Sequence, residues 1–178
     1  RELYAPNEKL KELELPVIQW EDWNKNSKEA KFIIKLGLQT HPSFQTIMNL
    51  MVQNRSSGLA LEYFFRNRSS GLGVKALEYF VSKLNDKYSR EYNSNSIQEE
   101  FLPCVNSGIY AKPSECYSSP DCAVMGFKIL HQRWHPWAVQ LGVKQHPDHN
   151  LLIERLKNCP PRNIDDAKRI FEYLAKRR

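Results

Sequence analysis

The sequence predicts an α+β fold that is mainly helical, in which two three-helix modules flank a small antiparallel β-hairpin or sheet. Three observations lead to this expectation. Apolar residues recur every three or four positions in several segments, which indicates amphipathic helices. Two short β-favouring runs enclose the turn Asn106-Ser107-Gly108, which is typical of a hairpin. The eight residues 36–43 recur in similar form at 141–148, which indicates that two parts of the chain are related.

The first helical module is expected at residues 27–98. Ser27 can cap its first helix, and Gly37 can end that helix. A second helix follows, with Thr40 or Ser43 as its cap, and a third helix is expected from Val74 to Glu91, where apolar residues repeat with helical spacing.

Two further segments adjoin or interrupt this module. Residues 1–26 mix prolines and aromatic residues without clear periodicity, so we expect an extended N-terminal arm. The run Asn-Arg-Ser-Ser-Gly-Leu occurs at residues 54–59 and again at 67–72. Because a structural repeat array requires more copies and longer units, we interpret residues 54–72 as an insertion.

Residues 99–130 are expected to form the hairpin and small sheet. The two hairpin strands are predicted at Phe101 to Val105 and Ile109 to Ala111, and a third strand is predicted at Val124 to Phe127.

The second helical module is expected at residues 131–178. It repeats the first module at a constant offset of 105 positions, and the apolar stripe of the following helix is kept because Ile47 corresponds to Leu152. Asn163 is the expected cap of its last helix.

The charge balance narrows the range of partners. The chain has 178 residues, with 26 Lys and Arg against 20 Asp and Glu, and its net charge is +6. Residues 119–178 hold most of this excess, with 11 positive and 6 negative side chains. Such a segment suits nucleic acid or an acidic partner, although Lys and Arg also favour the ends of helices.

The sequence also bears on the cellular location. No stretch supplies the roughly 20 apolar residues that a membrane span needs, so we expect no membrane partner. The chain has four cysteines and starts without a secretory leader, which favours a reducing compartment, cytoplasmic or nuclear. The start without Met also leads us to expect an excised part of a longer protein.

Five residues of types that bind zinc occur within a short part of the chain. They are Cys104, Cys116, Cys122, His131 and His135. Structural zinc sites usually bring their ligands in close pairs such as Cys-x2-Cys, and this spacing is missing. We therefore expect small buried thiols, no metal and no other cofactor.

Signatures of catalysis are missing as well. The sequence contains none of the usual nucleophile, phosphate-loop, zinc-protease or dinucleotide motifs. The pairs His41-Pro42 and His146-Pro147 are accounted for by helix starts. A weaker alternative is a hydrolase or nuclease site that would assemble from Asp121, His131, His135 and Glu154. We expect the chain not to be an enzyme.

The preferred hypothesis is a protein-interaction or scaffold module. Aromatic residues near the hairpin are candidates for the centre of an interface, namely Tyr117, Trp134 and Trp137. The competing interpretation is that the tryptophans fasten the hairpin to the second module.

The alternative function is nucleic-acid binding. Three helices followed by a hairpin are the elements of a winged-helix domain, whose third helix enters the major groove. That helix would use Lys75, Lys83, Lys87 and Arg90. Three acidic residues on the same segment nearly cancel these charges, whereas a helix that reads a groove should be more basic.

Several short runs resemble a large fungal family of unknown function that is related to sacsin. The runs are Leu3-Tyr4-Ala5-Pro6-Asn7, Ala30-Lys31-Phe32, Leu36-Gly37-Leu38, His41-Pro42-Ser43, Ala76-Leu77-Glu78-Tyr79-Phe80, Phe101-Leu102-Pro103, Tyr110-Ala111-Lys112-Pro113-Ser114-Glu115-Cys116, Leu141-Gly142-Val143 and Phe171-Glu172-Tyr173-Leu174-Ala175. The Pro-Ser-Glu and Leu-Gly-Val runs are also similar to the repeat regions of sacsin-like proteins.

The resemblance spans essentially the whole chain and implies a context. In that family this region would follow an ATPase domain of the gyrase and histidine-kinase type, which large heat-shock chaperones also use. The nucleotide-binding motifs of that domain have no counterpart here, so the resemblance assigns no nucleotide site. It implies a chaperone-related module whose partners are other domains of the parent chain or a protein client.

Overall fold

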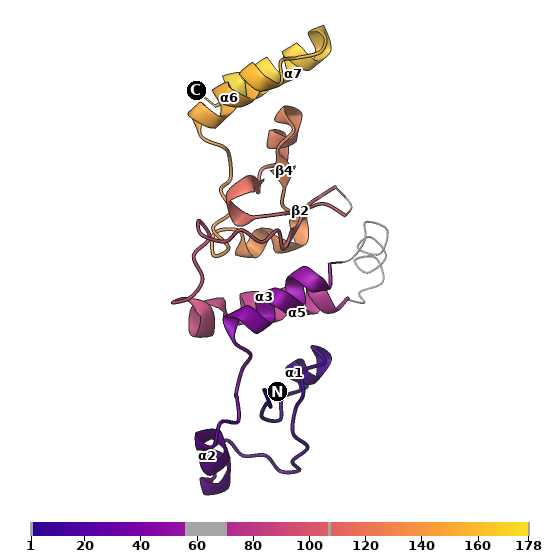
Figure 1. The fold of residues 1–178 in the computed structure, drawn as a ribbon. Helices are drawn as coiled ribbons and strands as arrows, with labels where there is room; N and C mark the ends of the chain where they lie inside the picture. Colours follow the sequence, from indigo (N-terminus) through magenta and orange to yellow (C-terminus); the bar gives the residue numbers. More distant parts are fainter. Residues whose placement is uncertain (1, 56–70, 107, 178) are drawn as a thin grey trace. The chain divides into compact units, whose positions relative to one another are not determined.

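The computed structural model describes residues 2–55, 71–106 and 108–177 (Figure 1). The fold is α+β and mainly helical, as the sequence predicts. By its internal contacts the chain forms two compact units. Among the described residues, unit 1 comprises residues 2–55 and 71–91, and unit 2 comprises residues 92–106 and 108–177.

Unit 1 is built from helices. They are α1 (Glu8–Glu12), α2 (Lys28–Lys35), α3 (Phe44–Gln53), α5 (Leu72–Lys83) and the wider helical turn η1 (Leu84–Tyr88). The side chains of Asn7, Ser27 and Ser43 cap the first three of these helices by accepting a backbone N–H. Most of the expected insertion lies outside the described residues.

Helices α3 and α5 pack against each other and form the core of unit 1 (Figure 1). Gly73 lets them approach, because a Cβ there would collide with the carbonyl group of Asn54. The rings of Phe80 and Tyr88 lie 5.5 Å apart, and the Tyr88 hydroxyl donates a hydrogen bond of 3.0 Å to the carbonyl oxygen of Pro42. The third predicted helix therefore exists, although its last part is the wider turn η1.

The segment that we expected to be an extended arm contains α1 and is bonded into unit 1. Tyr4 forms parallel bridges with Val17 on one side and Gln39 on the other. The N–H of Ile18 donates to the Tyr4 carbonyl oxygen (2.9 Å), and the N–H of Ala5 donates to the Gln39 carbonyl oxygen (2.8 Å). Three strand-like segments thus lie side by side, with Tyr4 in the middle.

Unit 2 contains the predicted hairpin. Strands β1 (Leu102–Pro103) and β2 (Tyr110–Ala111) pair antiparallel, with Leu102 opposite Ala111. A parallel pair joins β3 (Cys116–Tyr117) to β4 (Lys128–Ile129).

Unit 2 also contains several helical segments. They are the short turns η2 (Pro113–Glu115), η3 (Pro120–Met125) and η4 (Gln132–Trp137), and the longer helices α6 (His149–Asn158) and α7 (Ile164–Ala175). The predicted strand at Val124 to Phe127 is wrong, because η3 runs to Met125 and Gly126 then takes a left-handed conformation.

The bonding pattern around Tyr4 recurs in unit 2 around Tyr117. Tyr117 forms parallel bridges with Ile129 and Lys144. The N–H of Leu130 donates to the Tyr117 carbonyl oxygen (2.8 Å), and the N–H of Ser118 donates to the Lys144 carbonyl oxygen (3.0 Å). In both units the central tyrosine comes first along the chain, and its two bridge partners follow it in the same order.

The short helices between these strands also correspond. Leu10 of α1 and Cys122 of η3 are both fully buried, and the left-handed residues Glu14 (φ 57°) and Gly126 (φ 74°) follow at the same spacing. The residue after each left-handed position donates its N–H to the carbonyl oxygen of the buried residue. These bonds are Leu15 to Leu10 at 3.1 Å and Phe127 to Cys122 at 3.4 Å. Neither pair is similar in sequence.

The repeat therefore begins earlier than the sequence comparison indicates. Residues 4–18 correspond to residues 117–130, each with the same order of strand, short helix and strand. The expected arm at 1–26 is the first part of one repeat copy, and the expected sheet at 99–130 contains the first part of the other.

Candidate functional site

Two of the three predicted interface aromatics are buried. Trp134 is 0% exposed, and Tyr117 is 3% exposed because its ring packs against Phe127 at 5.2 Å. An interface role requires accessible side chains, so this prediction is wrong for both. Trp137 is half-buried, with its ring 5.9 Å from that of Trp134.

The zinc candidates do not converge. Cys104 and Cys116 are buried free thiols, and the hydrogen bond between them lowers the pKa of Cys104 and raises that of Cys116. His131 Nδ1 accepts a bond from the N–H of Arg133 (3.2 Å), and His135 Nε2 lies 3.0 Å from the carbonyl oxygen of Leu130. Each of these side chains therefore serves the local structure.

The last candidate thiol lies in a separate polar cluster of unit 2. Cys122 Sγ is 3.5 Å from Nδ1 of His146 and 3.4 Å from the hydroxyl of Tyr173. Burial raises the pKa of Cys122, and a buried neutral thiol is a poor nucleophile. The cluster joins η3 and the His-Pro loop to α7.

In the described part of the chain, no three His, Cys, Asp or Glu side chains are arranged to hold a metal ion. This holds for the five zinc candidates and for the alternative set of Asp121, His131, His135 and Glu154.

The four cations of the nucleic-acid hypothesis do not share one open helix face. Lys75 and Lys83 are half-buried on α5, which packs six of its twelve residues into the core. Lys87 and Arg90 are exposed, but they lie in η1 and beyond it, and Lys87 Nζ is 3.7 Å from the carboxylate of Asp86. A helix that enters a groove needs one free basic face.

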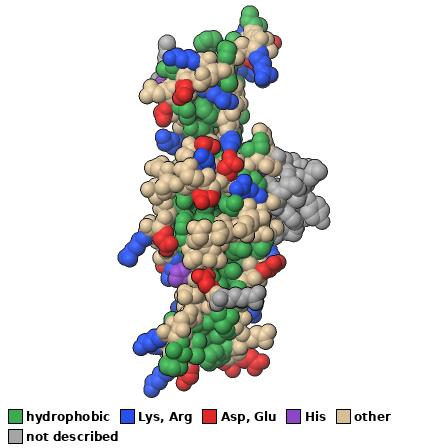
Figure 2. Space-filling model, in the orientation of Figure 1, with side chains coloured by type: hydrophobic (Ala, Val, Ile, Leu, Met, Phe, Trp, Pro, Cys, Tyr) green, Lys and Arg blue, Asp and Glu red, His purple; other side chains and the backbone are tan. Residues whose placement is uncertain are grey.

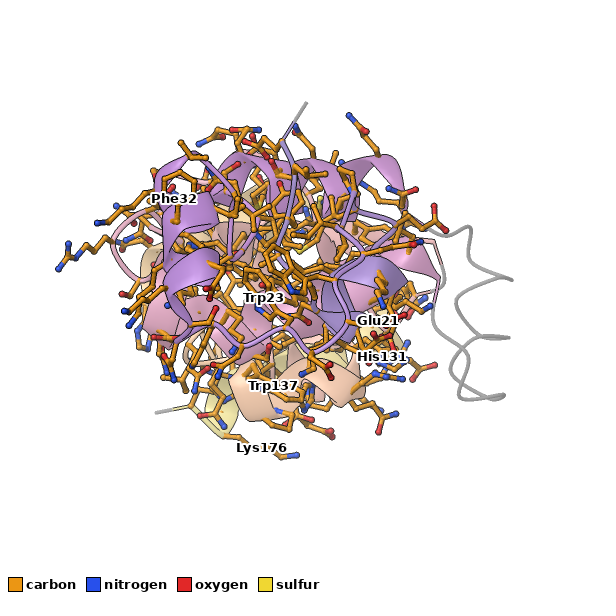
Figure 3. The ribbon with its side chains drawn as sticks, turned by 90° about the horizontal axis from the view of Figure 1, so that it is seen from below. Glu21, Trp23, Phe32, His131, Trp137 and Lys176 are labelled. Carbon is orange, nitrogen blue, oxygen red and sulfur yellow. The ribbon has the colours of Figure 1, made fainter. Side chains whose placement is uncertain are left out.

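Among the described residues of unit 1, the large apolar side chains with the highest exposure lie on and beside α2. Phe32 and Leu36, one helical turn apart, are 60% and 69% exposed. The three exposed lysines Lys28, Lys31 and Lys35 lie on the same helix. In Figure 2 green apolar side chains gather over the part of unit 1 that carries α2, and Figure 3 shows Phe32 on that helix.

A hollow of about 500 Å³ adjoins this helix within unit 1. Its apolar lining includes Leu3, Ile33 and Leu36, and Glu2 and Gln39 also line it. A Cβ placed on Gly37 would meet no atom within 4 Å, so the turn after α2 is open. We call this surface, made by Leu3, Phe32, Ile33, Leu36 and Gly37, the α2 surface.

The corresponding position in unit 2 is covered. Leu141, which matches Leu36 in the repeat, is fully buried, and its carbonyl oxygen accepts a bond of 2.8 Å from the Tyr92 hydroxyl. A Cβ on Gly142 would collide with the side chain of Ser94. The segment that begins at Tyr92 therefore covers Leu141 and Gly142 in unit 2, whereas the matching Leu36 and Gly37 of unit 1 are open.

Sequence reasoning missed the α2 surface. In the sequence, Ala30, Ile33 and Ile34 recur with helical spacing and indicate the inner face of this helix, and of these the structure fully buries only Ala30. Phe32 and Leu36 lie outside that face, and two large apolar residues on the outer side of an amphipathic helix are the signal that would have identified the surface.

A family model described as "Protein of unknown function (DUF3684)" matches residues 1–178. No curated protein matches the chain, and no solved structure matches it. Within the described residues, no helix combines the length and the apolar character that crossing a membrane requires.

Proposed function

From the premise that the chain belongs to the DUF3684 family of proteins of unknown function, we propose that it is a non-catalytic protein-interaction module. The observation that carries the proposal is the exposure of Phe32 and Leu36 on a helix held in place by its Ser27 cap. Fully burying one such side chain in a partner contributes about 1.5–3 kcal/mol. Two of them give an interface a strong apolar centre.

The charges beside this centre specify the partner further. Lys28, Lys31 and Lys35 are exposed on α2, whereas Glu29 is the only acidic residue of that helix. A partner with an apolar centre and an acidic rim would complement this surface. Such a partner is another domain of the parent chain or a protein client.

The wider context is part of the same proposal. The order of short runs along the chain resembles sacsin-related fungal proteins, which supports a role as one module of a larger, chaperone-related protein. Cys104, Cys116 and Cys122 are buried free thiols, which fits a reducing compartment and supports a place in the cytoplasm or nucleus.

The test measures binding of the whole chain to a permanently unfolded model protein with reduced and alkylated cysteines. We expect the double variant Phe32→Ser, Leu36→Ser to bind at least tenfold more weakly than the wild type. Phe171→Ser is the matched control, because Phe171 is 63% exposed on α7 of unit 2, and its affinity should stay at the wild-type value.

Two results would contradict the proposal. An equal loss of binding in both variants would show that general stickiness, not the α2 surface, holds the client. Binding to duplex DNA that weakens steeply with salt, without binding to the unfolded protein, would favour the nucleic-acid function instead.

A further inference from the structure

We propose that unit 1 binds an extended apolar segment of another polypeptide, which adds as an antiparallel strand to the edge formed by Val17, Ile18 and Gln19. The inference rests on the proposed function and names the class of partner. It comes from comparing the two repeat copies, because one copy is covered by a segment of its own chain at the place where the other is open.

In unit 2 the outer edge of β4 is paired. The N–H of Val105 donates to the carbonyl oxygen of Ile129 (2.8 Å), and the N–H of His131 donates to the carbonyl oxygen of Pro103 (2.9 Å). Between them Cys104 forms an antiparallel bridge with Leu130. The chain that enters the hairpin thus adds a strand to this edge.

The same edge of unit 1 is unpaired. By the repeat, Val17 and Gln19 occupy the positions of Ile129 and His131. Within the described residues, the carbonyl oxygen of Val17 and the N–H of Gln19 make no hydrogen bond. A strand edge with a free donor and acceptor is a template for another chain.

An apolar surface borders this edge. Val17 and Ile18 are half-buried, and Trp20, the next residue after Gln19, is 40% exposed. The Trp20 ring lies 5.3 Å from that of Trp23, edge to face. An added strand therefore gains aromatic contact area as well as backbone bonds.

The segment that covers unit 2 also reaches the position equivalent to the α2 surface. It begins at Tyr92, whose hydroxyl bonds the Leu141 carbonyl oxygen, passes Ser94 against Gly142, and ends in the strand at Val105. In unit 1 the carbonyl oxygen of Leu36 makes no hydrogen bond to the described residues. A bound segment about as long as residues 92–105 can therefore span both the α2 surface and the open strand edge of unit 1.

The occupied copy also indicates the chemistry of the partner. Phe101, Leu102 and Cys104 are all buried in unit 2. Pro103 accepts a hydrogen bond through its carbonyl oxygen and has no backbone N–H that would need a partner. We assign to the open edge a segment with an aromatic residue at its start and an apolar strand at its end. A second copy of this chain is a poor source, because its own segment already covers its unit 2.

The probe is a fluorescent synthetic peptide with the sequence of residues 92–112, added to the full 178-residue chain. In the chain, the matching segment already covers unit 2, so the peptide has the open edge of unit 1 to occupy. We expect saturable 1:1 binding, together with slower hydrogen exchange at the Gln19 amide. A peptide with Leu102 and Cys104 both replaced by Asn should bind at least tenfold more weakly.

Two variants of the chain separate the contribution of the Gln19 backbone N–H to peptide binding from that of its side chain. Gln19→Pro removes the N–H and should weaken peptide binding at least tenfold, whereas Gln19→Ala keeps the N–H and should bind as the wild type does. A thermal unfolding curve checks that both variants fold. If Gln19→Pro does not fold, exchange at the Gln19 amide of the wild type decides.

The inference is overturned if the peptide does not bind, or if it binds without slowing exchange at Gln19. Loss of client binding in the Phe32 and Leu36 variant, with no peptide effect at Gln19, would keep the proposed function and reject the strand. Self-association of the chain that Gln19→Pro abolishes would reject the assigned partner in favour of a second copy.

Discussion

The hydroxyl of Tyr92 donates a hydrogen bond of 2.8 Å to the carbonyl oxygen of Leu141. Leu141 is fully buried, and the bond fixes the start of unit 2 to the turn that precedes α6. Burial raises the pKa of Tyr92, so the hydroxyl stays protonated and remains a donor at neutral pH.

Removing this hydroxyl should destabilise the chain. We expect Tyr92→Phe to lower the free energy of unfolding by about 1 kcal/mol, because a buried carbonyl oxygen loses a donor. Urea unfolding followed by circular dichroism measures the change. Asn95→Ala, which shortens an exposed side chain nearby, is the control and should unfold as the wild type does.

A second prediction concerns Trp134, which the structure places in the core. Trp134→Ala should lower the free energy of unfolding by about 3–5 kcal/mol, because it leaves a large cavity. Trp134→Phe should cost less, since it fills more of the space and removes an indole Nε1 that has no hydrogen-bond partner in the described residues. The same urea titration checks both.

Wild-type stability of Trp134→Ala would contradict the burial of Trp134. Weaker client binding in that folded variant would restore the interface role that the sequence suggested for this residue.

The local structure was largely predictable from the sequence. Ser27, Ser43 and Asn163 cap helices as expected, since capping depends on residues within one turn. The hairpin was predictable for the same reason, because turn residues and alternating β-favouring runs lie close together in the chain.

The long-range arrangement was not predictable. The sequence indicates the repeat at residues 36–43 and 141–148 and in the helix that follows each, where residue types are kept. Upstream, Leu10 corresponds to Cys122 and Glu14 to Gly126, so at these positions the backbone pattern is kept although the side chains differ. The burial of Trp134 was not predictable either, because the sequence around an aromatic residue does not show whether its ring lies in the core or at the surface.

The two left-handed residues provide a matched pair of substitutions. Glu14 has φ 57° and carries a Cβ that this conformation disfavours, so Glu14→Gly should raise the free energy of unfolding by roughly 0.5–1 kcal/mol. Glu14→Ala keeps the disfavoured Cβ and should give no gain. Thermal unfolding of the three proteins at one pH is sufficient to compare them.

The reverse change at the equivalent position should destabilise unit 2. A Cβ on Gly126 would lie 2.7 Å from Nη2 of Arg155, whose side chain bonds the carbonyl oxygens of Met125 (3.0 Å) and Gly126 (3.3 Å). We expect Gly126→Ala to cost about 1–2 kcal/mol. Equal signs for Glu14→Gly and Gly126→Ala would contradict the structural equivalence of the two positions.

The last prediction concerns acid sensitivity and His41 of the first His-Pro pair. Burial lowers the pKa of His41, and the Lys87 ammonium group lowers it further, against the opposite effect of Asp86 and Glu91. The unfolded chain therefore takes up a proton at about pH 6.5 while the folded chain does not. Stability should fall as the pH drops below that value, by at most about 1.4 kcal/mol per pH unit for this group, and level off below the folded pKa.

Burial also lowers the pKa of His131 and His146, so these residues act in the same direction. Urea unfolding midpoints between pH 8 and pH 5 should decrease for the wild type and decrease less for His41→Gln. His149→Gln, which changes an exposed residue at the start of α6, should keep the wild-type dependence. An identical pH dependence of His41→Gln and the wild type would show that the environment of His41 does not resist its protonation.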